Sequence, residues 1–458
     1  MHMRIIIDIA IRRVRDWHTG KQRENSLYLK SRNVGLILLS VVMMSSLTLL
    51  MFGLDFSPGP VQILHLPTTL AQAVFVFWIA SRDGIETFLQ PLTKFQRLLV
   101  LVLSIYVVSV STFSEAPSAV MFAPAWVVHI LFFVALLSYF RAAGPKVATQ
   151  LWNTLGVAGL IHVSAFLWAW MIWPDAILEG RLPVFDNIRH LGYLAAPAAA
   201  VTALAFVART ERALLSLTFF AASLFYLFYT GSRGGVVALA GGIVLMSVFV
   251  KGAAIPVLPT RVAMIAVTTL AVVLVSELLP ALPWKTIFGR GADALEQTGD
   301  ELLSGRWKLW MHVVEAVREN WVFGYGPAIM AQISEFHGAP MRHPHNFGLQ
   351  LLLHWGFAGS LLFAALGVSF APVLLRSLRS VPCVMMLPLA ALTTMLLHAL
   401  VDGGLYYPFS AAIAIVALGA LCSRPSEDLT SLTADRIFPS VKPDDMPGHA
   451  PDDSDHYE

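Results

Sequence analysis

The residues best suited to chemistry lie in the segment RHPHNFGLQ, residues 342–350, where a polar stretch meets a long apolar one. His345 and Asn346 stand at the expected N-terminus of a helix, whose positive dipole end favours a neutral imidazole. A neutral His345 can take a proton from an acceptor hydroxyl and so act as a general base. Asn346 beside it is a candidate to contact the substrate. The alternative is that His345 and Asn346 only cap the helix.

Three further residues near this segment have open roles. His343 precedes Pro344 in a restrained, extended backbone, so it either contacts a substrate or only positions the loop. His354 lies nine residues beyond His345 and about half a turn round the helix, and we interpret it as a core histidine with satisfied hydrogen bonds. Asp402, in HALVDGGLYYP, is a candidate partner for His345 or for an arginine, or else a helix cap.

Arg233 lies in YTGSRGGVVALAGG, at an expected tight turn between two apolar helices. The neighbouring glycines, Gly231, Gly234 and Gly235, let backbone come close to whatever the guanidinium holds. The alternative is an arginine that snorkels to lipid headgroups.

Two other arginines are candidates on the same side. Arg306 opens GRWKLWMHVVEAVRENW, whose apolar residues recur at helical spacing and predict an amphipathic helix at the membrane interface. Its guanidinium is either a solvated charge or a cation that faces a phosphate. Arg189, beside His190 and close to Asp186, either belongs to a local ion pair that caps a helix or contacts a ligand.

Arginines that converge on one cavity suit a diphosphate, because the guanidinium is a planar fork of donors that keeps its charge. The membrane-borne diphosphate that fits is a polyprenyl diphosphate carrier. No acidic pair at metal-ligand spacing accompanies these residues, so we expect a reaction without metal or cofactor.

The elements that position these residues are membrane-length apolar segments. The chain is 57% hydrophobic and 13% charged, which predicts a polytopic integral membrane protein. Runs of about 20 apolar residues without strict alternation predict an all-α bundle. Twelve such runs are expected to span the membrane: 34–53, 61–80, 96–113, 117–140, 149–173, 191–208, 213–230, 234–250, 262–282, 346–375, 381–401 and 404–422.

The basic residues predict the orientation of these twelve helices. Residues 1–33 are rich in Arg and Lys, which predicts a cytoplasmic N-terminal segment. Eleven basic residues then fall in connections expected inside, against three in the short connections expected outside. The long loop 283–345, which lies between the transmembrane regions 34–282 and 346–422, is therefore expected to face outward. The Asp/Pro-rich tail 423–458 is expected to be disordered in the cytoplasm.

Three pieces of the sequence resemble the O-antigen ligase family, which includes O-antigen polymerases and protein O-oligosaccharyltransferases. They are TGSRGGVVALAGG, GRWKLW with VRENWVFGYGPAIM, and HPHNFGLQLLLHWGFAGSLLFAALG, which together cover about residues 225–370. The His-Asn-containing piece is the more specific, and the first 190 residues carry no diagnostic motif.

The resemblance implies a glycosyltransferase at the periplasmic face of a bacterial inner membrane. It would move O-antigen glycan from undecaprenyl diphosphate to lipid A-core oligosaccharide, with inversion and without a metal. By motif, Arg233 and Arg306 would bind the diphosphate and His345 would activate the acceptor, whereas Arg189 has no matching motif. Membrane lipids are the other expected partners, and no nucleic acid is expected.

Two other functions stay open at this point. A polymerase that joins glycan repeats on the same carrier would need the same arginines and histidine, and only the single long loop favours a ligase. A transporter of lipid-linked sugars would need ionisable residues at mid-membrane and repeated halves, and the sequence shows neither pattern.

Overall fold

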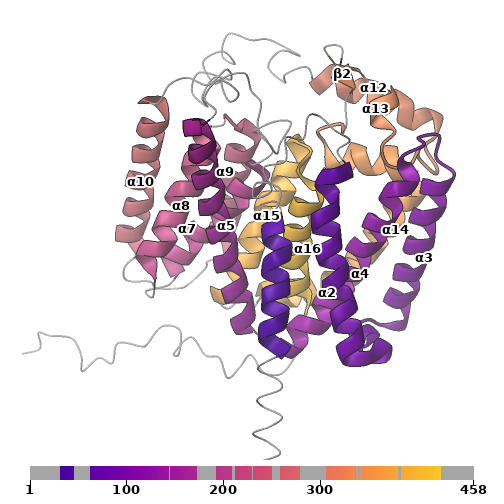
Figure 1. Ribbon diagram of the computed structural model, residues 1–458, viewed down its shortest axis with the longest axis horizontal. Coiled ribbons are helices and arrows are strands. Elements are labelled where there is room, and N and C mark those ends of the chain that lie inside the picture. The colour runs from indigo at the N-terminus through magenta and orange to yellow at the C-terminus, as the bar shows by residue number, and fades with distance from the viewer. Residues whose placement is uncertain are drawn as a thin grey trace, which may run out of the picture. The chain divides into compact units, whose positions relative to one another are not determined.

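The computed structural model describes most of the helical part of the chain (Figure 1). Outside the described residues lie four features predicted from the sequence: the basic segment up to residue 30, Arg189, most of the long loop before residue 306, and the tail after residue 423. The described residues are 31–45, 62–143, 145–172, 192–208, 212–229, 231–249, 258–278, 306–333, 335–336, 339–340, 343–379 and 383–423.

The described fold is helical, as the sequence predicts. A helix at Ser31–Ser45 precedes α2 (Gln62–Leu89), α3 (Lys94–Thr112), α4 (Ala119–Ala143), α5 (Pro145–Ile172), α7 (Gly192–Ala208), α8 (Ala213–Tyr229), α9 (Arg233–Phe249) and α10 (Leu258–Leu278). After these come α12 (Arg306–Glu319), α13 (Met330–Ile333), the antiparallel pair β1 (Glu335–Phe336) and β2 (Ala339–Pro340), α14 (Phe347–Arg379), α15 (Cys383–Val401), the 3₁₀ turn η2 (Gly404–Tyr406) and α16 (Pro408–Cys422). Each of the twelve predicted apolar segments overlaps one of these helices, and residues 46–53 of the first segment lie outside the described residues.

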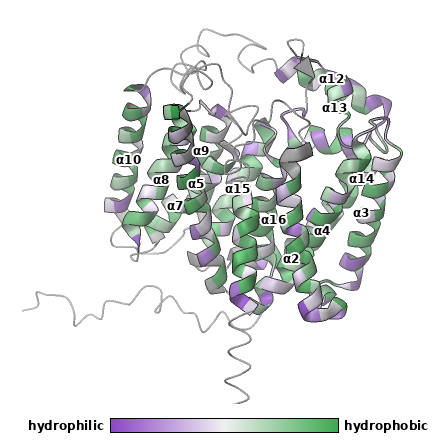
Figure 2. Ribbon diagram, viewed as in Figure 1, coloured by the Kyte–Doolittle hydropathy of each residue, from purple (hydrophilic) through white to green (hydrophobic). Residues whose placement is uncertain are grey.

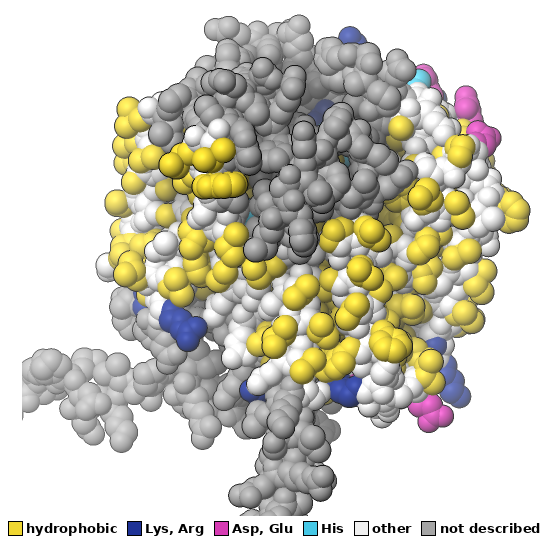
Figure 3. Space-filling model, viewed as in Figure 1, with side chains coloured by type: hydrophobic (Ala, Val, Ile, Leu, Met, Phe, Trp, Pro, Cys, Tyr) yellow, Lys and Arg dark blue, Asp and Glu magenta, His cyan; other side chains and the backbone are white. Residues whose placement is uncertain are grey.

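The helices have the composition of a membrane protein. Four are both long and apolar enough to span a bilayer: α3, α4, most of α10 and most of α14. Six other described helices are apolar but shorter. Hydrophobic residues run along most of the helices (Figure 2), and hydrophobic side chains cover much of the visible surface, with Lys and Arg gathered mainly below them (Figure 3). The number of spans and their orientation stay predictions.

Small residues allow α7 and α15 to pack closely in the middle of the bundle. Helix α7 reads GYLAAPAAAVTALAFVA, and nearly all of its alanines are buried. Because alanine brings backbones close together, α7 contacts α8, α9 and α15. Helix α15 also contacts α5 and α16, and this packing on several sides fixes the position of its C-terminal end at Val401.

Helix α14 is broken at Gly356, where the sequence predicts a continuous helix over 346–375. Gly356 has φ 57° and ψ −167°, a backbone conformation that side-chain-bearing residues rarely adopt. The chain after α12 docks into the break, where Tyr325 N–H donates to Leu353 O at 2.9 Å and Phe357 N–H donates to Trp321 O at 2.7 Å. These backbone bonds replace the helical ones that the break removes.

Candidate functional site

Asp402, directly after α15, is the centre of a polar cluster at one end of the bundle. Its Oδ1 accepts hydrogen bonds from His345 Nδ1 at 2.6 Å, Tyr193 Oη at 2.9 Å and its neighbour's backbone, Gly403 N, at 2.8 Å. Its Oδ2 lies 3.3 Å from an N–H of Arg306. The side chain of Asp402 is 13% exposed, so these four groups take the place of water around the carboxylate.

His345 is held in a strained conformation directly before α14. Its φ is +53°, in the left-handed region that costs a residue with a side chain about 1–2 kcal/mol. Pro344, which precedes it, accepts a hydrogen bond from Trp310 Nε1 of α12 at 2.8 Å. The amphipathic helix therefore anchors the backbone that presents the imidazole, and such strain is often found at functional sites.

The hydrogen bond to Asp402 determines which nitrogen of His345 can accept a proton. When the imidazole is neutral and its Nδ1–H donates to the carboxylate, the lone pair lies on Nε2. The carboxylate also stabilises the imidazolium that forms when Nε2 takes up a proton. With 24% of its side chain exposed, His345 combines a fixed orientation with access from outside the protein.

The carboxylate of Asp402 stays ionised at neutral pH. Burial acts to raise its pKa, but the hydrogen bond from His345 and the charges of His345 and Arg306 lower it more. The net pKa of Asp402 therefore lies well below its ordinary range, so the base has a negatively charged partner throughout the physiological pH range.

Arg306 begins α12, as predicted, and reaches the end of α15. One guanidinium N–H donates to the carbonyl of Val401, and another faces Asp402 Oδ2. The side chain is 27% exposed. Since a guanidinium carries five donors, Arg306 can hold the end of α15 and present its charge to an anion at the same place.

Arg233 begins α9 in the predicted tight turn, beside the same end of α15. Gly231 has φ +65°, which closes the turn after α8, and Gly234 packs against α15. A Cβ built on Gly234 would lie 3.3 Å from both the His398 ring and Val401 Cγ2, which belong to residues four and one positions before Asp402. The turn that carries Arg233 therefore meets the helix end that binds Arg306 and His345.

Asn346 adopts the capping role that the sequence offers as an alternative. Its Oδ1 accepts from Leu349 N at 3.0 Å at the start of α14, and its Nδ2 donates to Leu400 O of α15 at 3.0 Å. Asn346 thus ties the start of α14 to the end of α15. Its contact with a substrate stays a prediction.

The two remaining histidines of the segment differ in surroundings. His343 is buried and packs its ring on His345, with 4.2 Å between centroids, and on Tyr406, with 5.1 Å. It is therefore part of the cluster, not only of the loop. His354 is buried in the core as predicted, but neither ring nitrogen has a hydrogen-bond partner among the described residues, so its interpretation as a satisfied histidine is wrong.

Sequence reasoning missed Tyr193 and the adjacent pair Tyr406 and Tyr407 at the end of η2. Tyr193 lies on the alanine-rich α7, 209 residues from Asp402, and only the fold brings its hydroxyl to the carboxylate. Gly403 was also missed: a Cβ there would lie 2.1 Å from the His343 ring, so only glycine lets that histidine approach. The sequence HALVDGGLYYP contains the signal, in the two glycines after the acid and the two tyrosines beyond them.

The described residues contain no group of three or more His, Cys, Asp or Glu side chains placed to hold a metal ion. The expectation of a metal-free reaction stays a prediction. What the described cluster offers is an Asp-oriented imidazole with the guanidinium of Arg306 on the same carboxylate, which is suited to proton transfer beside an anionic group.

Fold and site together define a helical membrane protein with a His–Asp–Arg cluster at one end of its bundle. Residues 218–364 match the family model described as O-antigen ligase. The match confirms the resemblance seen in the sequence and contains Arg233, Arg306 and His345. Asp402 lies beyond the matched residues. No curated protein matches the chain.

The family match supports a membrane glycosyltransferase of the O-antigen ligase or polymerase type. In general terms, this family implies a lipid-linked glycan and a lipid acceptor as substrates.

Proposed function

We propose that the protein is an O-antigen ligase that transfers glycan from undecaprenyl diphosphate to lipid A-core oligosaccharide, at the periplasmic face of a bacterial inner membrane. The observation that carries this proposal is the contact of Asp402 with both His345 and Arg306, beside the turn that bears Arg233. This contact supports the proposal because a single-displacement transfer from a diphosphate needs a base and a cation at the same place.

In the proposed reaction, His345 Nε2 takes the proton of an acceptor hydroxyl while the oxygen attacks the anomeric carbon of the donor glycan. The bond between that carbon and the diphosphate oxygen breaks, and its electron pair leaves with the diphosphate. One displacement inverts the anomeric centre. Asp402 stabilises the imidazolium that forms, and the guanidinium groups of Arg306 and Arg233 stabilise the charge on the departing diphosphate.

The polar groups assist the reaction because they are organised before it begins. Asp402 is fixed by four hydrogen-bond donors, and His345 is fixed by Asp402 on one side and by the His343 ring on the other. A base that needs no reorientation avoids an entropic cost when the acceptor binds. A general base in such a position typically contributes about 10²–10⁴-fold to the rate.

Lipopolysaccharide from a strain that lacks the gene tests the acceptor. A ligase predicts core oligosaccharide without long chains on a gel, restored by the wild-type gene but not by a His345→Ala variant. A core that carries a single repeat would instead identify the polymerase, and unchanged lipopolysaccharide would refute both.

Transfer by the purified protein tests the reaction itself. Proteoliposomes that contain the protein, the lipid-linked glycan and the acceptor should form product, also with a chelator present. If a fluorescent carrier crosses these membranes and product never forms, the protein is a transporter.

A further inference from the structure

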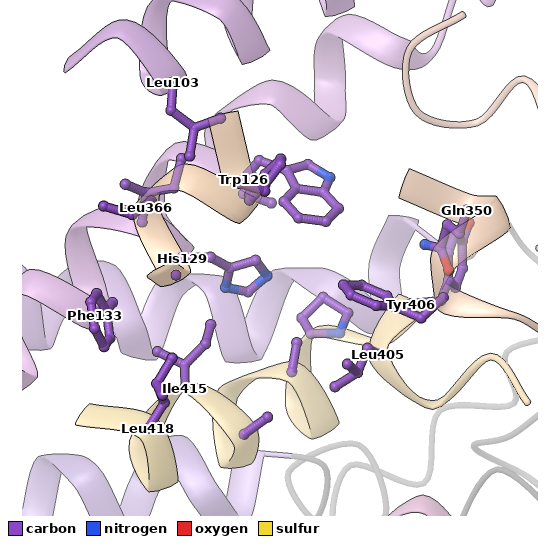
Figure 4. Close-up of a pocket in the computed structure, with 18 of the residues that line it drawn as sticks. Leu103, Trp126, His129, Phe133, Gln350, Leu366, Leu405, Tyr406, Ile415 and Leu418 are labelled. Carbon is purple, nitrogen blue, oxygen red and sulfur yellow. The ribbon is translucent and has the colours of Figure 1, made fainter. Parts of the chain in front are cut away.

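A second site lies beside the His–Asp–Arg cluster, in an apolar cavity of about 320 Å³ between α3, α4, α14 and α16. Tyr406, whose ring contacts His343 in the cluster, also lines the cavity and so marks the end nearest the cluster. Phe133 and Leu418 line its far end (Figure 4). The cavity walls are mostly hydrocarbon and aromatic side chains, which suit an alkyl chain.

Three buried polar side chains interrupt this apolar wall. Gln350 and His354 come from the first half of α14, and His129 comes from α4. Gln350 is 2% exposed, His354 is 1% exposed and His129 is 9% exposed. Gln350 Nε2, both ring nitrogens of His354 and His129 Nδ1 have no hydrogen-bond partner among the described residues. Figure 4 shows the His129 ring in the middle of the cavity, with Gln350 near the end that Tyr406 marks.

Unpartnered polar groups in a buried site cost free energy, so a ligand that supplies their hydrogen-bond partners gains affinity there. The amide of Gln350 can only donate from Nε2, and a neutral imidazole donates from one nitrogen. The ligand must therefore carry hydrogen-bond acceptors within an otherwise apolar structure. An ester carbonyl at the head of a hydrocarbon chain has this chemistry.

The cavity is long enough for an acyl chain. Its lining residues on α4 run from Phe122 to Phe133, eleven positions or about 16 Å at about 1.5 Å per residue. On α14 they run further, from Phe347 to Leu374, on both sides of the break at Gly356. The polar side chains Gln350 and His354 lie toward the cluster end, where the ester group of such a chain would sit.

We propose that this cavity binds one acyl chain of a glycerophospholipid, with its ester carbonyl hydrogen-bonded by Gln350 and His354. The isoprenoid tail of a polyprenyl carrier fits less well, because its hydrocarbon contains no acceptor and leaves both side chains unpartnered. The bound lipid packs against Tyr406, which contacts His343, and so stabilises the position of the cluster. This site is separate from the proposed diphosphate-binding arginines.

Three photoactivatable lipids test the proposal in nanodiscs that contain the full-length protein. The three lipids are a phosphatidylethanolamine with ester-linked chains, its diether analogue without carbonyls, and a polyprenyl phosphate. All three carry the same diazirine group. Adducts on peptides of α4, α14 and α16 are compared with adducts on α10, whose residues are largely exposed. The expected result is that the ester lipid labels the cavity at least about fivefold more than the diether, because each of the two lost hydrogen bonds is worth about 1 kcal/mol.

Gly367 provides a variant that blocks the cavity with little risk to folding. Gly367 lines the cavity, and a Cβ built there meets nothing within 4 Å. Gly367→Leu should reduce cavity labelling by the ester lipid to the level of α10. The control, Val368→Leu, changes a neighbouring residue that is 69% exposed and does not line the cavity, and it should label as the wild type does.

A double variant, Gln350→Leu with His354→Leu, should label equally with ester and diether lipids. If this variant does not fold, the comparison of the three lipids on the wild-type protein still tests whether the cavity binds an ester-linked acyl chain. The proposal is overturned if the polyprenyl probe labels the cavity more than the ester lipid does, or if ester and diether label the wild type equally. Cavity labelling no higher than that on α10 would indicate a water-filled or empty space and would also overturn it.

Discussion

Replacing Asp402 by Asn removes one charge from the cluster and leaves its size unchanged. In the wild type, Oδ1 accepts from three donors and Oδ2 faces Arg306. An asparagine would keep its amide oxygen toward the three donors. In the reverse orientation its amide N–H₂ would face three donors, whereas in this one it faces only Arg306. Its amide N–H₂ would then face the guanidinium of Arg306, donor against donor.

The effect on kcat follows from the lost charge. The charge-assisted hydrogen bond to His345 becomes a neutral one, which loses about 1.5 kcal/mol of stabilisation of the imidazolium. This loss lowers kcat by about tenfold, at about 1.36 kcal/mol per factor of ten. The unpaired donors at Arg306 cost about 1 kcal/mol as well, but in the ground state and the transition state alike, so they lower stability and leave kcat unchanged.

The assay is glycan transfer in proteoliposomes, with kcat measured for Asp402→Asn and for the control Asp83→Asn. Asp83 lies in α2, where it pairs with Arg82, and it has no contact with the cluster. The control should keep wild-type activity. A kcat of Asp402→Asn within twofold of wild type would refute the role of Asp402 as the partner of the base.

The same variant changes the pH dependence of stability. Because the native pKa of Asp402 is lowered, its carboxylate stabilises the fold above the unfolded value of about 3.9, and this contribution is lost as pH falls through the lower native pKa. Thermal unfolding in detergent should therefore show a loss of stability below about pH 4 that is smaller in Asp402→Asn. If both proteins lose the same stability as the pH falls below about 4, the lowered pKa of Asp402 is contradicted.

Three other substitutions test separate parts of the structure. Arg233→Lys should reduce transfer nearly as much as Arg233→Ala, since a lysine cannot form the planar fork that grips a diphosphate. Gly403→Ala should lower kcat at least tenfold, because its Cβ would lie 2.1 Å from the ring of His343, which packs on the base. Gly324→Ala should lower stability by about 2–4 kcal/mol, from its φ of +70° and from a Cβ 2.5 Å from Gly356 N.

Each of these substitutions has a result that would count against its reasoning. A fully active Arg233→Lys protein would exclude forked phosphate binding, and a fully active Gly403→Ala protein would show that the position of His343 is unimportant. For Gly324 the matched control is Gly84→Ala, where φ is +76° but a Cβ meets nothing within 4 Å. If thermal unfolding in detergent shows that Gly324→Ala and Gly84→Ala lose the same stability, the close contact of Gly324 with Gly356 contributes nothing to that loss.

Most of the described helices could be predicted from the sequence because they are apolar runs, and α12 could be predicted from its amphipathic spacing. The interruption of α14 could not, since a glycine inside an apolar helix pattern is usually tolerated. The chain that fills the break, around Tyr325, comes from a polar loop, and its partner carbonyls lie about 30 residues further on. Only the three-dimensional contact between Gly324 and Gly356 explains why both are glycine.

The candidate site was predictable where the residue type itself carries the chemistry. His345 at a helix start, Arg306 at the start of an amphipathic helix and Asp402 after the next apolar helix could all be singled out. The hydroxyl of Tyr193 and the unpartnered state of His354 could not, because both depend on which side chains surround them after folding.

The central claim is that His345 is the base that activates the acceptor. The direct test compares His345→Ala with the wild type in reconstituted transfer and in the binding of polyprenyl diphosphate to the purified protein. We predict that transfer falls by at least about 10²-fold while binding stays within twofold, because the arginines remain. Transfer at the wild-type rate by His345→Ala would contradict the claim.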